Sequence, residues 1–190
     1  SISLLRGAVD GNNELGNDYT LVNGIKHDSN GNLWVLNNQS KERNILMLTK
    51  DGKWDNHYQQ ELSNNNNVSY SGLRSMMIDS RGLLWFVNSH WSNPALFCYD
   101  MSSNVLMKYN TFVNQDGTSY EVTNVYCVCE DLEGNIWMGT NQGPFMIQKS
   151  EVGQASVTFQ QIKVPRNDGS DYADYLLSGV NISSMAIDGG

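Results

Sequence analysis

The sequence is poor in basic residues and has no long hydrophobic run. It contains 12 Lys and Arg against 20 Asp and Glu, which gives a formal net charge of −8. Proteins that neutralise the phosphates of a duplex need clustered positive charge, so we expect no nucleic-acid partner. No apolar run approaches the roughly 20 residues of a membrane-spanning helix, and residues 1–13 lack the features of a signal peptide. We therefore expect no membrane span in this chain.

Cysteine is scarce as well. The chain has three cysteines, an odd number, and two of them, Cys127 and Cys129, lie two residues apart. In the strand predicted there, both side chains point to one face and cannot easily form a disulfide. A metal or redox pair is the alternative, but no further Cys or His stands at ligand spacing. We interpret both residues as small packing residues.

Catalytic constellations are also missing. The histidines are few, and none has the setting of a Cys-His pair, a Ser-His-Asp triad or a zinc-binding HExxH helix; they are His27, His57 and His90. Acidic residues cluster only at Asp168, Asp171 and Asp174. These are expected to be solvated or turn-forming acids, with a weak cation site as the alternative. We expect no enzymatic activity, no cofactor and no metal.

What the sequence does contain is an internal repeat. The pattern Asp-x-x-Gly-x-x-Trp occurs three times, and its copies begin 51 and 52 residues apart. A period near 50 predicts repeated supersecondary units. Part of a fourth copy follows and ends with Asp188 at the position of the motif Asp. The residues of the full copies are Asp28, Gly31 and Trp34; Asp79, Gly82 and Trp85; and Asp131, Gly134 and Trp137.

Each copy of the motif predicts a β-hairpin. The Asp side chain can accept backbone N–H groups in a turn, and the Gly can adopt the positive φ that most residues resist. The Trp falls in the second strand, where it can anchor the hairpin against a neighbouring unit. A calcium loop is the alternative for the first copy, but Gln39 stands where the bidentate Glu would be needed. We therefore interpret the first copy as a hairpin turn and not as a calcium-binding loop.

Two more strand-like runs follow each hairpin. The repeat unit thus consists of four antiparallel strands, which is typical of a β-propeller blade. We predict an all-β fold, a β-propeller segment of three full four-stranded blades over residues 20–58, 70–109 and 122–162. Single strands of incomplete flanking blades are expected over residues 1–10 and 180–190. Unpaired sheet edges at the ends lead us to expect that the chain self-associates in isolation.

The third copy also resembles a known family. Residues 131–140 match D-x-x-G-N-[LI]-W-x-G-T, a pattern similar to the two-component regulator propeller repeat. That family implies periplasmic sensor propellers of hybrid histidine kinases and propellers of other envelope proteins, including surface proteins of type IX secretion that carry two propellers and a sandwich domain. Residues 22–34, 140–147, 162–177 and 186–190 carry the likeness to this last group.

The first two copies depart from the family pattern. Leu36 and Val87 replace its second Gly, and Asn37 and Asn88 replace its Thr. We interpret these departures as favouring a secretion scaffold. Its location would be the periplasm or outer surface of a Gram-negative bacterium, and its partner a protein of the secretion or signalling machinery, or a glycan or glycolipid. The alternative is a sensor propeller that recognises an oligosaccharide; a propeller lyase or hydrolase is a more distant one.

Strand direction predicts which face binds a partner. If the motif turns lie at one end of every blade, the longer and uneven loops lie at the other end. Aromatic residues in or beside these loops suit a sugar ring or a protein surface. The alternative is that each aromatic packs only against its own loop. The predicted contact residues are Trp91, Tyr120, Tyr172, Tyr70 and Tyr175.

Overall fold

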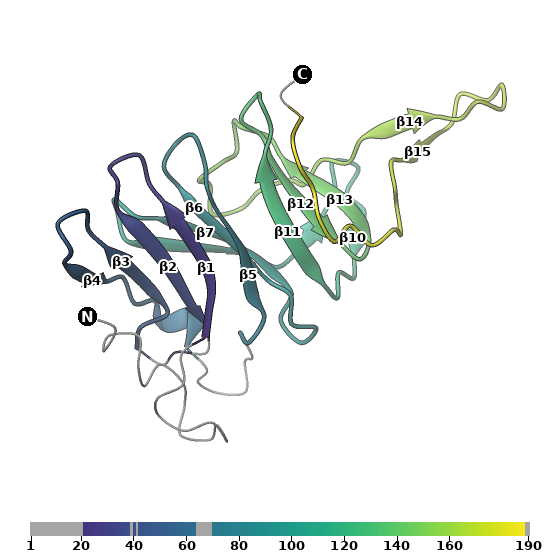
Figure 1. Ribbon diagram of the computed structural model, residues 1–190. Coiled ribbons are helices and arrows are strands. Elements are labelled where there is room, and N and C mark those ends of the chain that lie inside the picture. Colours follow the sequence, from purple (N-terminus) through teal and green to yellow (C-terminus); the bar gives the residue numbers. More distant parts are fainter. Residues whose placement is uncertain (1–20, 39, 41, 64–69, 189–190) are drawn as a thin grey trace.

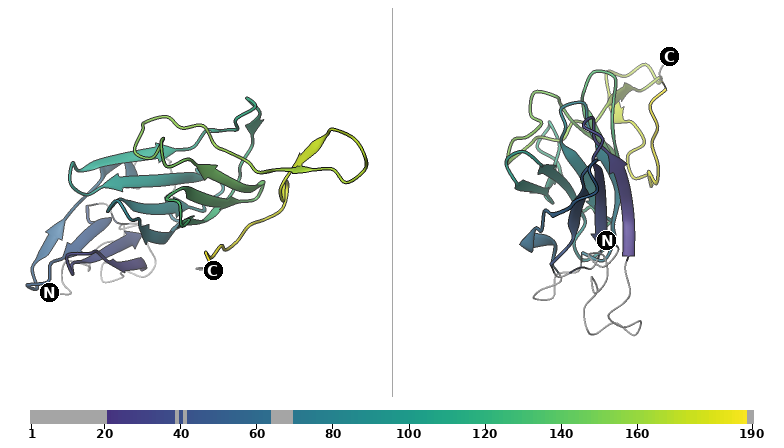
Figure 2. Two further views of the ribbon diagram at one scale, coloured as in Figure 1. Left: turned by 90° about the horizontal axis from the view of Figure 1, so that it is seen from above. Right: turned by 60° about the vertical axis from the view of Figure 1, so that its left-hand side comes forward.

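The computed structural model describes residues 21–38, 40, 42–63 and 70–188. Three antiparallel sheets stand side by side in it, and a two-stranded arm projects beyond the third (Figures 1 and 2). The strand predicted within residues 1–10 lies outside the described residues.

The first two sheets each have four strands in sequential order. The first contains β1 (Leu21–His27), β2 (Leu33–Asn38), β3 (Ile45–Leu48) and β4 (Trp54–Asn56). The second contains β5 (Leu73–Ile78), β6 (Leu84–Asn88), β7 (Ala95–Asp100) and β8 (Val105–Tyr109). A short 3-10 helix, Gln60–Leu62, lies between the two sheets in the chain. This is the predicted all-β arrangement of propeller blades.

The third sheet is less regular than predicted. It contains β11 (Val125–Glu130), β12 (Ile136–Thr140) and β13 (Gly143–Ile147). The last strand-like run of the blade predicted over residues 122–162 is residues 157–162, and it pairs with the third sheet through one isolated bridge, in which Met146 and Gln160 exchange backbone hydrogen bonds of 2.9 and 2.7 Å. A second isolated bridge joins Phe159 to Asn114 of the segment that carries β9 and β10. A full fourth strand is therefore replaced by two isolated points of pairing, only one of them on the third sheet.

The strand expected after residue 180 is also absent from the described part, which ends at residue 188. Instead, the N–H groups of Gly179 and Ile182 donate to the carbonyl oxygens of Gln142 and Thr140, at 3.1 and 2.9 Å. The segment thus lies against the third sheet. Residues 180–188 are not assigned to a strand, and the incomplete following blade stays a prediction.

Every other side chain of β2 and of β6 packs against the next sheet, and these contacts join the sheets. Trp34 and Leu36 belong to a core cluster with residues of the second sheet, including Leu84 and Phe86. Trp85 and Val87 belong to the next cluster, which includes Ile136 and Met138 of the third sheet. Successive side chains of a strand point to opposite faces, so the Trp of each hairpin faces the following sheet. Trp34 is 2% and Trp85 0% exposed, whereas Trp137 in the third sheet is only partly buried.

The inner strands β1, β5 and β11 lie next to one another. Each first hairpin has a register shift at the same place, next to the small residues Gly24, Ser75 and Cys127. A Cβ on Gly24 would lie 2.7 Å from the Cβ of Met76, and Ser75 Oγ accepts the N–H of Val128 at 3.1 Å. Small residues at this position therefore let neighbouring inner strands approach.

Two further hairpins lie in the long connections, residues 110–122 and 163–179, which we expected to be loops. The first contains β9 (Phe112–Val113) and β10 (Ser119–Tyr120), and the second is the arm of β14 (Lys163–Pro165) and β15 (Ala173–Tyr175). The turn of the first uses Asn114 as the motif turns use Asp, since its Oδ1 accepts the N–H groups of Asp116 and Thr118. This turn carries no Trp, which is why the repeat pattern did not reveal it.

Candidate functional site

The motif turn of the first sheet is organised by a single carboxylate. Oδ1 of Asp28 accepts the backbone N–H groups of Asn30 and Asn32, each at 2.9 Å. Oδ2 accepts the Trp34 indole N–H at 2.9 Å. Gly31 has φ of 82°, which allows the chain to reverse. The Asp therefore fixes both the turn and the orientation of the Trp six residues later.

The same geometry recurs in the other two sheets. The indole N–H groups of Trp85 and Trp137 donate to Asp79 and Asp131 at 2.9 and 2.8 Å. Burial raises the pKa of Asp131, but hydrogen bonds from Trp137, Asn135 and the backbone outweigh it and hold the pKa below its usual value. The pKa of Asp28 is lowered in the same way. The carboxylates of Asp28 and Asp131 thus remain ionised acceptors at neutral pH.

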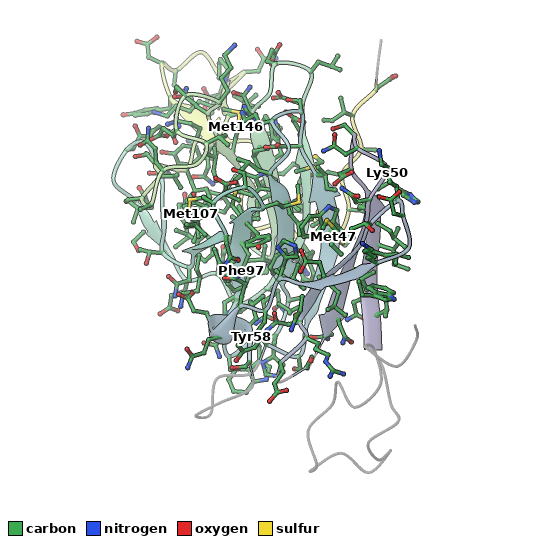
Figure 3. All side chains as sticks on the ribbon, turned by 90° about the vertical axis from the view of Figure 1, so that its left-hand side faces the viewer. Met47, Lys50, Tyr58, Phe97, Met107 and Met146 are labelled. Carbon is green, nitrogen blue, oxygen red and sulfur yellow. The ribbon has the colours of Figure 1, made fainter. Side chains whose placement is uncertain are left out.

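We call the end of the sheets that carries these turns the turn end. Figure 3 looks onto the first sheet: Lys50 lies at the turn end and Tyr58 at the opposite end, with Met47 and Phe97 between them. The turns of the three sheets lie along this one edge of the molecule (Figure 1).

The second and third sheets are tied together at the turn end. Arg81, two residues after the motif Asp, donates to Glu130 at 3.3 Å and to the carbonyl oxygen of Gly134. Glu130 precedes the next motif Asp, and its other oxygen accepts the N–H of Ser80 at 2.7 Å. Arg81 also forms an ion pair with Asp79 at 3.2 Å. This network bridges the two turns.

Between the first and second sheets the equivalent pair is different. Asn30 takes the place of Arg81, and Ile78 takes the place of Glu130. Neither residue can form the ion pair, and an open cleft of about 680 Å³ lies between these turns. This volume is within the usual range for small-molecule sites. We take this turn-end cleft as the candidate functional site.

The cleft combines a polar rim with apolar side chains. Its polar lining includes His27, Ser29, Asn30 and Asn32 from the first sheet, and Ser80, Arg81, Asp100 and Ser102 from the second. Its apolar lining is Trp34, Met47, Ile78, Leu83 and Met101. Trp34 is almost fully buried, so its ring contributes little open surface.

One wall of the cleft is a contact across the sheets. His57 Nδ1 lies 2.8 Å from the hydroxyl of Tyr99, which donates to Oδ1 of Asn104 at 2.8 Å. The His57 ring also makes an edge contact with Trp34, with centroids 4.6 Å apart. Burial raises the pKa of Tyr99 to about 12, so the hydroxyl stays neutral. This arrangement holds the end of the first sheet onto the second.

The predicted contact residues do not form one site. Trp91 is 73% exposed in the β6–β7 loop, where its ring stacks on His90 with centroids 5.9 Å apart. Tyr70 is only 6% exposed and packs edge-on against Phe97, with centroids 5.5 Å apart. The prediction of Tyr70 as a contact residue was therefore wrong, because its ring belongs to the core.

The other three tyrosines lie near the third sheet. Tyr120 is partly buried and packs edge-on against Phe145, with centroids 5.3 Å apart. Tyr172 is 71% exposed on the arm, beside Arg166. The hydroxyl of Tyr175 donates to Asp116. Tyr120 and Tyr175 thus have structural contacts of their own, and Trp91 and Tyr172 remain the exposed candidates.

The residues considered for chemistry stay apart. His27 and His57 line the cleft, while His90 bonds to Ser92 in a loop, 2.7 Å away. Asp168 accepts a hydrogen bond from the backbone N–H of Ser170, and Asp174 forms an ion pair with Arg166 at 2.7 Å. Within the described ranges no group of three or more His, Cys, Asp or Glu residues could hold a metal ion. Nor does any helix there have the length and apolarity to cross a membrane.

Comparison with known proteins supports the assignment of the repeat. Residues 119–142 match the family model described as two component regulator propeller. The predicted resemblance is confirmed here. The matched segment contains the third motif, from β10 to the turn after β12. No curated protein sequence matches the chain significantly.

Solved structures extend the likeness to the whole fold. PorZ, an essential bacterial surface component of the type-IX secretion system of Porphyromonas gingivalis, matches with a TM-score of 0.74 and 18% identity. The match covers 92% of this chain and 24% of PorZ. Virginiamycin B lyase from Staphylococcus aureus matches with a TM-score of 0.52 and 18% identity, over 80% of this chain and 44% of the lyase. The chain therefore spans less than half of either protein, and the likeness shows a shared propeller fold.

Proposed function

We propose that this chain is part of a non-catalytic β-propeller that serves as a scaffold or binding module of a bacterial cell-envelope protein associated with type IX secretion. The observation that supports this most is the extent of the likeness to PorZ, which runs through all three sheets and covers 92% of the chain. A propeller fold hosts many functions, so the role in secretion is proposed from the likeness to PorZ. Its location would be the periplasm or the outer surface of a Gram-negative bacterium.

A sensor propeller of a hybrid histidine kinase is the second candidate. The family model matched by residues 119–142 supports it, since that repeat is named after two-component regulators. A sensor would bind an oligosaccharide and change transcription, whereas a scaffold would be needed for export of other proteins. The two roles therefore predict different defects in the same deletion strain.

Deletion of the encoding gene in its host, with complementation, tests the proposal. We expect the protein in the envelope fraction and a loss of secreted cargo from the cell surface, with growth on polysaccharides unchanged. Normal secretion combined with a lost transcriptional response to one polysaccharide would replace the scaffold by the sensor. Recovery of the full-length protein from the cytoplasm would contradict both.

A further inference from the structure

The turn-end cleft has one carboxylate that its own turn does not saturate. Asp28 and Asp79 use both oxygens for their motif turns and Trp residues. Asp100 differs. Its Oδ1 accepts the N–H and hydroxyl of Ser102, at 2.9 and 2.7 Å, and the N–H of Ser103 at 3.3 Å, while no hydrogen bond from the described residues reaches Oδ2. The cleft thus offers an acceptor at Asp100.

The charge of the lining selects against anions. Three carboxylates line the cleft, Asp28, Asp79 and Asp100, against one guanidinium, Arg81. Arg81 is already paired with Asp79 and Glu130. The lining contains no Lys and no second Arg. A phosphate or carboxylate ligand would therefore meet net negative charge.

The apolar lining selects against a sugar. Sugar rings are usually held by an open aromatic face, but the Trp34 ring is buried. The remaining apolar groups are Met47, Ile78, Leu83 and Met101. Flexible thioethers and aliphatic groups suit an unbranched methylene chain. A ligand with an aliphatic stem and a cationic end satisfies both the lining and the charge, as long basic side chains do elsewhere.

We propose that the turn-end cleft binds a lysine or arginine side chain presented by a partner protein, with its stem on Met47 and Met101 and its cation at Asp100. The volume favours a peptide over a free amine, because about 680 Å³ is the size of a site for a drug-sized ligand. The proposal rests on the proposed function only in treating the chain as a binding module. It would stand if the envelope protein were a sensor.

Titration of the purified 190-residue chain tests this at low salt and pH 8. The probes are the capped peptides Gly-Gly-Lys-Gly-Gly and Gly-Gly-Arg-Gly-Gly, with norleucine and glutamate peptides of the same length as controls. We expect weak, saturable binding of the basic peptides alone. Equal binding of the norleucine peptide would overturn the proposal, as would saturable binding of spermidine without the basic peptides.

Two variants locate the site. Asp100→Asn should weaken the lysine peptide about three- to fivefold, the size expected for a partly exposed ion pair. Asp51→Asn, an exposed acid outside the cleft lining, removes the same charge and should leave affinity unchanged. An equal loss in both variants would show unspecific attraction and would contradict the proposal.

A double variant, Asn30→Arg with Ile78→Glu, copies the Arg81–Glu130 bridge into the cleft. It should abolish peptide binding, with an unchanged melting temperature as evidence of folding. Unchanged affinity in a folded double variant would overturn the assignment of the cleft. If this variant does not fold, the comparison of Asp100→Asn with Asp51→Asn decides whether the cleft binds the peptide. All these readouts are independent of secretion, so failure here and failure of the proposed function are distinguishable.

Discussion

The indole N–H of Trp85 donates a 2.9 Å hydrogen bond to Oδ2 of Asp79, and both side chains are buried. The other carboxylate oxygen accepts the backbone N–H groups of Arg81 and Leu83 at 2.9 and 2.8 Å. One carboxylate therefore shapes the turn and orients the Trp that anchors the sheet. The six-residue spacing in the repeat is the distance over which a single side chain can do both.

Asp79→Ala should destabilise the protein strongly. It leaves the Trp85 indole N–H and two backbone N–H groups without their acceptor, and each buried unpaired donor costs about 1–3 kcal/mol. We expect a loss of about 3 kcal/mol in the free energy of unfolding, measured by urea denaturation. Asp79→Asn keeps an acceptor oxygen and should lose less. An alanine variant as stable as the parent would contradict the role of the carboxylate.

Two of the three motif tryptophans, Trp85 and Trp137, should differ in their contribution to the free energy of unfolding. Trp85 lies between the second and third sheets, so Trp85→Ala should cost about 3–5 kcal/mol. Trp137 is only partly buried, so Trp137→Ala should cost no more than about 2 kcal/mol. Equal losses in thermal or urea unfolding would show that the sheets do not stack as described.

Tyr99→Phe tests the contact between the first and second sheets. Removing the hydroxyl takes away the partner of His57 Nδ1 and the donor to Asn104. We expect a loss of about 1–2 kcal/mol in the free energy of unfolding. Tyr172→Phe, on the exposed arm, is the matched control and should change nothing. A neutral Tyr99→Phe would mean that the hydroxyl contributes no net stability.

Acid should destabilise the fold in a defined range. Hydrogen bonds from Ser102 and Ser103 lower the pKa of Asp100 to about 2, and the pKa values of Asp28 and Asp131 are also below the ordinary 3.8. A lowered folded-state pKa adds stability above the unfolded-state pKa, and this stability is lost as pH falls through the folded value.

The melting temperature should therefore stay level from neutral pH to about 5 and fall between about 4 and 2. Ser102→Ala removes a hydrogen bond to Asp100 and should make that fall shallower. A melting temperature that rises as the pH is lowered from 4 to 2 would refute this sign.

The repeat predicted the hairpins because turn chemistry is local. Asp28 with Gly31 specifies a turn regardless of what surrounds it. The position of the Trp then decides which side chains of the second strand point toward the neighbouring sheet. The lack of a fourth strand in the third sheet could not be predicted in this way. How residues 157–162 pair depends on the neighbouring β9–β10 hairpin, because the N–H of Phe159 donates to the carbonyl oxygen of Val113 at 3.1 Å.

The departures from the family pattern have local reasons. A Cβ on Gly139 would lie 2.4 Å from the carbonyl oxygen of Ile182, whereas Leu36 and Val87 are buried at equivalent positions in the core between sheets. Asn37 reaches across a longer loop to the carbonyl oxygen of Arg43, a role that the shorter Thr140 fills in a tighter turn. These substitutions therefore reflect packing and loop length rather than a choice between sensor and scaffold.

The candidate site was missed because the face was chosen from loop length and aromatic content. The useful signal was at two positions of the repeat, where Arg81 and Glu130 close one gap while Asn30 and Ile78 leave the other open. Comparing these positions between copies could have located the cleft. Its volume and its unsatisfied Asp100 oxygen depend on tertiary packing and needed the structure.

Hydrogen exchange of the five indole N–H groups, followed by two-dimensional NMR, tests the central claim. The claim is that the motif Asp holds the Trp indole in place and that Trp34 and Trp85 pack between successive sheets. The Trp85 and Trp34 indoles should exchange slowest, since they are buried and bonded to Asp79 and Asp28. Trp137, bonded but only partly covered, should be intermediate, and Trp91 should exchange at the rate of a free indole. Rapid exchange at Trp85, or equal rates for Trp85 and Trp91 in the folded chain, would contradict the account.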